Sequence, residues 1–148
     1  MDPYRRELCI KGHRSDLPSI IDFVEDSAAE AGVDPGIRFD LQLAVEEACT
    51  NVIEHAYHDQ GGEFEVCFET RDRDVRITIH DHGQPFDPAR VRRPDLSLPL
   101  EDRRVGGLGL FLIEKLMDEV SFSFTVNGNT LVMIKHNAVS PGRWADAA

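Results

Sequence analysis

The feature that most constrains the fold is a change in the spacing of apolar residues near residue 60. Before that point, apolar residues recur at helical spacing along the run Leu41, Ala44, Val45, Ala48, Val52 and Ala56. After Gly61-Gly62 they alternate with polar residues, in Phe64, Val66 and Phe68 and then in Val75, Ile77 and Ile79. The chain therefore predicts helices followed by an antiparallel β-hairpin with one buried face.

The flanking segments extend this pattern toward the N-terminus. A first strand is expected over residues 4–11, and a helix from the N-cap Ser15 to the C-cap Gly32. A second helix is expected from Asp34-Pro35 to about Tyr57, because proline suits the first helical position.

Beyond the hairpin, a long segment without periodicity runs from His82 to Val105. A third helix should follow it, and two strands at about 119–126 and 130–136 should flank the turn Asn127-Gly128-Asn129. Helices on one face of a mixed, mostly antiparallel sheet predict an α+β fold, a two-layer α/β sandwich. We expect one domain over 1–148, with a flexible tail at 138–148.

The composition excludes several classes of protein. The net charge of −11 argues against a general nucleic-acid binder and against docking on an anionic membrane. No apolar leader or membrane-length stretch is visible, which predicts a cytoplasmic protein. Cys9, Cys49 and Cys67 lie in apolar patterns without a C-x-x-C pair, so buried reduced thiols are expected.

Polar residues interrupt the second helix in the segment EEACTNVIEHAY, residues 46–57. Glu47 and Asn51 lie within about 40° of each other around the helix, and Glu54 and His58 continue the stripe. This stripe is either the solvated flank of an amphipathic helix or a set of groups facing a ligand. An asparagine oxygen can ligate Mg²⁺, and a glutamate can take a proton from a nucleophile.

A second candidate site is the end of the hairpin, ITIHDHGQPFDP at 77–88. Strand alternation places Asp81 on the buried side, where a carboxylate is costly unless it accepts hydrogen bonds. Backbone donors in the turn or an amine of a ligand could supply them. Gly83 permits either a sharp turn with positive φ or the close approach of a flat ligand.

The third candidate is GGLGLFL at 106–112, directly before a helix. Glycines at a helix N-terminus expose N–H groups that suit phosphate, although they also serve as hinges. The preceding loop concentrates positive charge in an acidic protein, through Arg90, Arg92, Arg93, Arg103 and Arg104. Phosphate, a negatively charged partner or simple solubility would each explain these arginines.

Three segments resemble, in this order, the N box and the two glycine boxes of GHKL superfamily ATP-binding domains. They are EEACTNVIEHAY, DHGQPFDP (81–88) and GGLGLFLIEKLMDEV (106–120). More narrowly, the chain resembles the anti-sigma-factor serine/threonine kinases, from its first strand to about His136. The resemblance implies the Bergerat ATPase fold, with an ATP lid at about 84–106. Pro85 departs from the superfamily pattern, which has a second glycine there.

The resemblance also implies roles for residues. Glu47 would be the general base that activates a serine hydroxyl, and Asn51 would hold Mg²⁺ against the ATP phosphates. Asp81 would accept from the adenine amino group. The other expected nucleotide-binding residues are Gly83 at the base, Gly107, Leu108 and Gly109 at the phosphates, Thr130 in support of Asp81, and Arg104 from the lid.

The implied function is a kinase that phosphorylates a serine of a STAS-domain anti-sigma-factor antagonist and sequesters a sigma factor, without direct contact with nucleic acid or membrane. A homodimer is plausible by the same resemblance. The alternative is an ATP-binding partner-switching module with little or no kinase activity; the presence of both Glu47 and Asn51 favours the kinase.

A metal-dependent hydrolase is a further alternative, because zinc or iron suits the set His55, His58, His80, Asp81 and His82. Strand alternation places His80 and His82 on the face opposite Asp81, so only one set can point inward. This alternative is therefore disfavoured.

Overall fold

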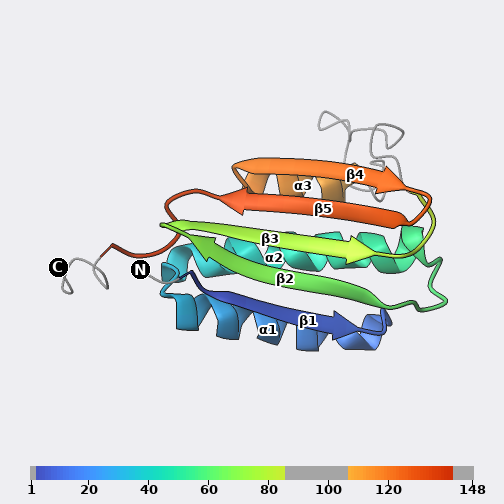
Figure 1. Ribbon diagram of the computed structural model, residues 1–148, viewed down its shortest axis with the longest axis horizontal. Coiled ribbons are helices and arrows are strands. Elements are labelled where there is room, and N and C mark those ends of the chain that lie inside the picture. The colour runs from blue at the N-terminus through green and yellow to red at the C-terminus, as the bar shows by residue number, and fades with distance from the viewer. Residues whose placement is uncertain (1–2, 86–106, 142–148) are drawn as a thin grey trace, which may run out of the picture.

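The computed structural model describes residues 3–85 and 107–141, which form two layers (Figure 1). One layer is a sheet of five strands, β1 (Arg5–Ile10), β2 (Phe64–Arg71), β3 (Asp74–Asp81), β4 (Glu119–Thr125) and β5 (Gly128–Lys135). The other layer covers one face of the sheet with α1 (Leu17–Ala31), α2 (Pro35–Asn51) and α3 (Gly107–Leu116). The predicted α+β two-layer sandwich is thus confirmed.

The strand order is β1-β2-β3-β5-β4. Every pairing among the described strands is antiparallel, where a mixed sheet was expected. The hairpin β2–β3 and the hairpin β4–β5 meet along the β3–β5 ladder, in which Asp81 lies opposite Asn129. Residues far apart in the sequence therefore meet at one end of this ladder.

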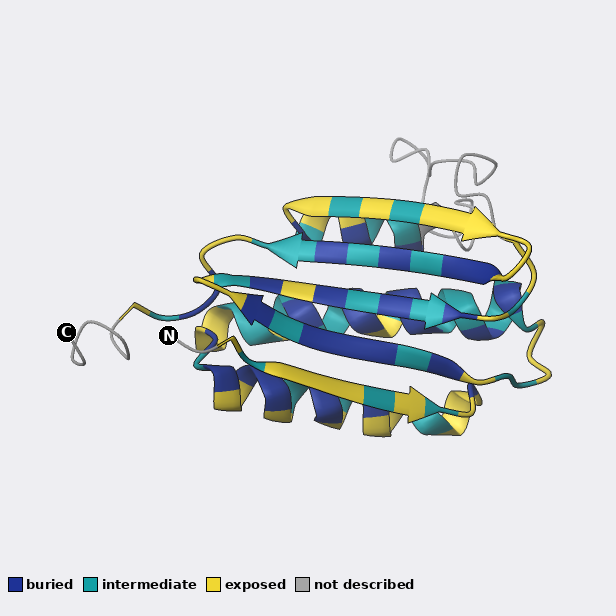
Figure 2. Cartoon of the chain, in the orientation of Figure 1, coloured by how far each residue is buried: buried dark blue, intermediate teal, exposed yellow. Residues whose placement is uncertain are grey.

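The core lies between the sheet and the helices (Figure 2). Burying each large aliphatic or aromatic side chain contributes about 1.5–3 kcal/mol relative to leaving it in water. The largest fully buried side chains are Phe64, Phe68, Ile20, Leu41, Ile53, Ile77, Ile79, Ile113 and Met133. The period-two residues of the hairpin and the helical stripe of α2 supply most of this set, as the sequence predicted.

Two helix boundaries follow the sequence signals and one does not. Gly32 ends α1 in the left-handed conformation with φ of 78°, and the Asp34 carboxylate caps α2 by accepting from the Gly36 N–H at 2.8 Å. The N-cap prediction for Ser15 is wrong, because residues Arg14–Asp16 form a short 3₁₀ turn and α1 begins at Leu17.

The predicted flexible tail is wrong for its first residues. Ala138 and Val139 are fully buried, and their N–H groups donate to the Arg73 carbonyl at 2.8 and 2.9 Å. Val139 also bridges to Val33, which ties this segment to the loop between α1 and α2. Residues 142–148 of the predicted tail lie outside the described residues.

The cysteine prediction is correct for Cys49 and Cys67 but wrong for Cys9, which is exposed. Its neighbour Leu8 pairs with the buried Val66, so Cys9 points to the face of the sheet that no helix covers. No helix in the described ranges is long and apolar enough to cross a membrane.

Candidate functional site

Glu47 and Asn51 lie on the side of α2 that faces α3. The apolar residues Leu41, Ala44 and Val45 point into the core and fix the rotation of the helix. The Cβ that a side chain at Gly109 would carry lies 3.0 Å from Glu47 Oε2 and 3.7 Å from Asn51 Oδ1. The second glycine box therefore contacts the polar stripe of α2, and a side chain at Gly109 would crowd the Glu47 carboxylate.

The environment of Glu47 makes its carboxylate a stronger base. Burial raises the pKa of Glu47 above its usual value, and the negative charges of Glu46 and Glu54 raise it further. Glu46 itself is exposed on another side of α2. The structure thus separates the two neighbouring glutamates into one that faces α3 and one that faces solvent.

Directly after Asn51 the chain winds into a π-helix, η2 (Val52–Ala56), where the sequence predicted a regular helix to Tyr57. Such wider turns occur frequently at functional sites. The change splits the predicted stripe, because Glu54 pairs with Arg14 at 2.8 Å and His58 is exposed with φ of 50°. Only Glu47 and Asn51 remain beside Gly109.

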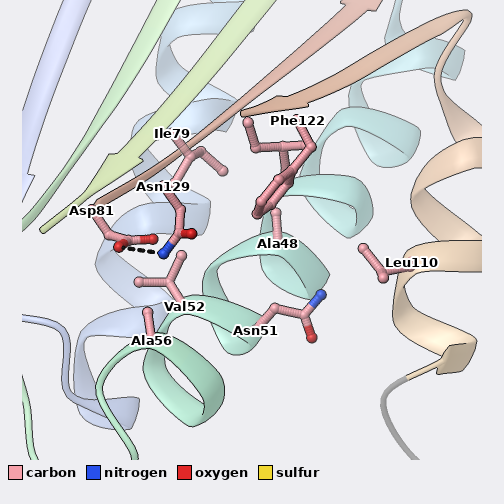
Figure 3. A pocket seen from close by; sticks show the side chains of 10 residues that line it. Ala48, Asn51, Val52, Ala56, Ile79, Asp81, Leu110, Phe122 and Asn129 are labelled. Atoms are coloured by element: carbon pink, nitrogen blue, oxygen red, sulfur yellow. Dashed lines mark hydrogen bonds between the residues drawn. The ribbon is translucent and has the colours of Figure 1, made fainter. Parts of the chain in front are cut away.

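A pocket opens between the sheet and η2, with Asp81 at its inner end (Figure 3). Asp81 is 2% exposed, and its Oδ1 accepts from the Gly83 N–H and from Asn129 Nδ2, both at 2.9 Å. Asn51 lines the pocket near α3. Asn129 also lines the pocket, and the other lining residues are apolar: Ala48, Val52, Ala56, Ile79, Leu110, Phe122 and Leu131.

The predicted support of Asp81 by Thr130 is wrong. Thr130 lies opposite His80 in the β3–β5 ladder, and its hydroxyl is 2.7 Å from His80 Nδ1 on the other face of the sheet. Asn129 supports Asp81 instead and also donates to the Gln84 carbonyl at 2.8 Å. Sequence reasoning missed Asn129 because it assigned that residue to a turn, whereas β5 already begins at Gly128.

Gly83 is required for a reason that the sequence did not show. Its φ is not positive; instead, a Cβ at this position would lie 2.5 Å from the Ala56 carbonyl oxygen. The Gln84 N–H donates to that same oxygen at 3.1 Å. Gly83 therefore lets the loop after β3 pack directly on the end of η2.

The remaining predicted residues are only partly placed. Gly107 and Leu108 form the first residues of α3. Arg104 and residues 86–106 of the predicted lid lie outside the described residues.

The histidines of the disfavoured hydrolase do not converge. His80 and His82 stack edge to face on the outer face of the sheet, and His82 contacts the Glu65 carboxylate at 3.0 Å. Within 3–85 and 107–141, no three histidine, cysteine or acidic side chains form a group that could hold a metal ion.

The site combines a mostly apolar pocket that contains the hydrogen-bonded Asp81 carboxylate with the Asn51 amide on its lining and the Glu47 carboxylate one helical turn before Asn51. The first part suits a flat heterocycle that carries an N–H donor, since the walls are apolar and Asp81 accepts. The second part offers the oxygen ligands that Mg²⁺ prefers, together with a base. These chemical properties are compatible with a nucleotide.

Comparison with known proteins agrees with this geometry. Residues 12–135 match the family of histidine kinase-like ATPase domains, and the chain belongs to that family. Two curated relatives are both named serine-protein kinase RsbW. That of Halalkalibacterium halodurans is 43% identical over 100 residues, covering 65% of this chain and 60% of the relative. That of Bacillus thuringiensis is 36% identical over 101 residues, covering 66% and 62%. The chain thus spans about three fifths of the length of these relatives.

Solved structures share the fold. The RsbU and RsbW domains of Rv1364c from Mycobacterium tuberculosis match with a TM-score of 0.63 and 21% identity, over 88% of this chain and 32% of that one. A histidine kinase domain from the Erythrobacter litoralis blue-light activated histidine kinase EL346 matches with a TM-score of 0.55 and 15% identity, over 90% and 64%. At these identities the likeness concerns the fold alone.

Proposed function

We propose that this protein is an ATP-dependent serine/threonine protein kinase and anti-sigma factor. It transfers phosphate from Mg-ATP to a serine of a STAS-domain anti-sigma-factor antagonist and sequesters a sigma factor. The observation that carries this proposal is the convergence of Glu47, Asn51 and Gly109, because Asn51 also lines the pocket that contains Asp81. The names of the curated relatives support it.

Asp81 recognises the base. Its Oδ1 is already used by Gly83 and Asn129, whereas no residue in 3–85 or 107–141 donates to its Oδ2. Oδ2 is therefore the oxygen that accepts from the adenine amino group. Gly83 lies beside the base, and Gly107, Leu108 and Gly109 offer the backbone at the N-terminus of α3 to the phosphates.

Asn51, which lines the pocket, and its neighbours Glu47 and Gly109 fit Mg²⁺. The Asn51 amide oxygen is a hard ligand of the kind this ion prefers, and Gly109 leaves space beside it. When bound, the ion neutralises charge on the phosphates. In this proposal, Arg104 is the residue of the predicted lid that contacts the phosphates.

Glu47 acts as the general base. Its carboxylate accepts the proton of the serine hydroxyl, and its raised pKa makes it a better acceptor than an ordinary glutamate. The apolar side chains of Leu110 and Phe122 line the pocket and exclude water from the end that binds adenine.

The sequence also supports a proposal for the binding partners, the cellular location and the oligomeric state. The net charge of −11 supports partners that are proteins, with no direct nucleic-acid contact and no membrane contact. A cytoplasmic location and a homodimer complete the proposal.

The decisive experiment compares Glu47→Gln with the exposed neighbour Glu46→Gln. Each variant is incubated with a STAS-domain antagonist and Mg-ATP, and phosphate on the antagonist is measured by mass spectrometry. Glu47→Gln is expected to transfer phosphate about 10²–10⁴-fold more slowly, and Glu46→Gln at close to the normal rate, because burial contributes more than Glu46 to the raised pKa of Glu47. An unchanged rate for Glu47→Gln refutes the base assignment.

A calorimetric titration of ATP precedes this assay. Binding that requires Mg²⁺ and is weakened by Asn51→Ala supports the nucleotide site. Binding without any phosphate transfer to the antagonist favours the partner-switching module over the kinase. Folded protein that binds neither ATP nor ADP refutes the site.

A further inference from the structure

The loop that follows Asp81 is fastened to the rest of the protein at each of its first three residues. The His82 N–H donates to the Tyr57 hydroxyl at 2.8 Å, and the Gly83 N–H donates to Asp81 Oδ1 at 2.9 Å. Gln84 donates its N–H to Ala56. The path of this loop decides where the Asp81 carboxylate is held, because Gly83 bonds to that carboxylate directly.

Tyr57 connects this loop to the strand on its other side. Its hydroxyl accepts from the His82 N–H and donates to the Glu63 carbonyl, just before β2 begins. Burial raises the pKa of Tyr57, so the hydroxyl keeps the proton that it donates. Its ring packs so closely on Gly62 that a Cβ there would lie 2.3 Å from the ring. The Tyr57 side chain is therefore fixed at both its ring and its hydroxyl.

The backbone around Tyr57 is also fixed. Its N–H donates to the Val52 carbonyl at 3.1 Å and closes η2. The next two residues, His58 and Asp59, both have positive φ, at 50° and 61°, which non-glycine residues rarely adopt. Arg14 pairs with the Asp59 carboxylate at 2.9 Å and holds this sharp exit from the helix.

We propose that Tyr57 is a positioning residue for base recognition: its hydroxyl sets the position of residues 82–84 and, through Gly83, the direction of the Asp81 carboxylate. This inference depends on the proposed nucleotide site. Tyr57 does not line the pocket that contains Asp81; it lines a neighbouring pocket together with Gly83 and Gln84, and its hydroxyl is bonded to the loop, so we assign its effect on the base to the loop. Removal of the hydroxyl should weaken recognition of the amino group without changing the phosphate end of the site.

The test uses Tyr57→Phe, which keeps the ring against Gly62 and removes only the hydroxyl. The matched control is Tyr4→Phe, since Tyr4 is the other tyrosine of the chain and its hydroxyl bonds to Glu30 on the far side of the molecule. Affinities are measured by calorimetry for Mg-ATP and for Mg-purine riboside triphosphate, which lacks the 6-amino group. Antagonist phosphorylation at saturating ATP gives kcat, and urea unfolding checks the fold.

Tyr57→Phe is expected to weaken Mg-ATP binding about fivefold, as for the loss of one net hydrogen bond. It should leave kcat and the affinity for the purine analogue unchanged, and Tyr4→Phe should change neither affinity. Equal weakening of both nucleotides, or no weakening of either, overturns the positioning role. If the wild-type protein binds no ATP, the nucleotide site itself fails; if it binds ATP and Tyr57→Phe binds equally well, only the role of Tyr57 fails.

Discussion

Replacement of Asn129 by leucine tests how the pocket is held together. Leucine has nearly the same shape as asparagine but donates no hydrogen bond, so Asp81 Oδ1 and the Gln84 carbonyl each lose a donor. Asn129 is 3% exposed and Asp81 2%, so water replaces these donors poorly. A lost bond to a carboxylate costs about 1.5–3 kcal/mol and the partly buried bond to the Gln84 carbonyl up to about 1 kcal/mol, which predicts a loss of roughly 2–4 kcal/mol.

The assay is urea unfolding at equilibrium, with Asn127→Leu as the control. Asn127 lies two residues earlier, is exposed in the β4–β5 turn, and should change the free energy of unfolding by no more than about 0.5 kcal/mol. If Asn129→Leu costs no more than Asn127→Leu, the two hydrogen bonds do not stabilise the pocket. A double-mutant cycle with Asp81→Asn should show coupling of at least about 0.5 kcal/mol, because the two side chains are in contact.

Three further predictions follow from the site and from the opposite end of the sheet. Gly109→Ala should stabilise α3 by up to about 1 kcal/mol in thermal unfolding, yet slow phosphate transfer, because its Cβ would lie 3.0 Å from Glu47 Oε2. Thr130→Val should leave ATP affinity unchanged in calorimetry, since its hydroxyl lies on the outer face of the sheet. His136 has a pKa raised above 6.5, chiefly by its hydrogen bond to Asp74, so the folded protein binds this proton more tightly than the unfolded chain does. Its stabilisation should be complete below that value and lost as the pH rises through the raised pKa, measured as the difference in unfolding free energy from His136→Gln.

Each of these has a clear opposing result. Normal transfer by Gly109→Ala would show that Glu47 moves aside without cost to catalysis. Weakened ATP binding by Thr130→Val would restore the role that the sequence assigned to Thr130. A difference between wild type and His136→Gln that does not vary with pH would show that the contact with Asp74 does not depend on the charge of His136.

The parts of the fold that could be predicted are those in which periodic burial and local turn chemistry agree. The part of the helical stripe that lies in α2, from Leu41 to Ala48, and the alternation in β2 and β3 each place one apolar face against the core, and few other arrangements bury both. Asp34 and Gly32 mark helix ends because capping is a local interaction between side chain and backbone, or a local φ. These signals depend on short segments, which the sequence displays directly.

The site could be predicted only in part, because its details depend on register and on contacts between distant segments. The resemblance assigned the support of Asp81 to Thr130, but the β3–β5 register places Asn129 opposite Asp81, and neighbouring strand residues point to opposite faces. The π-helix after Asn51 has no local signature comparable to a cap, and the contact of Gly83 with Ala56 joins two distant segments. Tyr57 was invisible for the same reason, since its partners lie 6 and 25 residues away.

The β3–β5 ladder has a consequence for how affinity and folding energy are linked. Asp81 and Asn129 close one end of this ladder, while the two hairpins that it joins could each keep their own pairing if it opened. A nucleotide that requires both residues binds only when β3 and β5 are paired. Its binding free energy therefore adds to the free energy that is needed to separate these two strands. In amide hydrogen exchange, the N–H groups shared by β3 and β5 should therefore gain more protection from ATP than those between β1 and β2. A nucleotide in the pocket would therefore stabilise the pairing between the hairpin β2–β3 and the hairpin β4–β5, and nucleotide affinity would depend on that pairing.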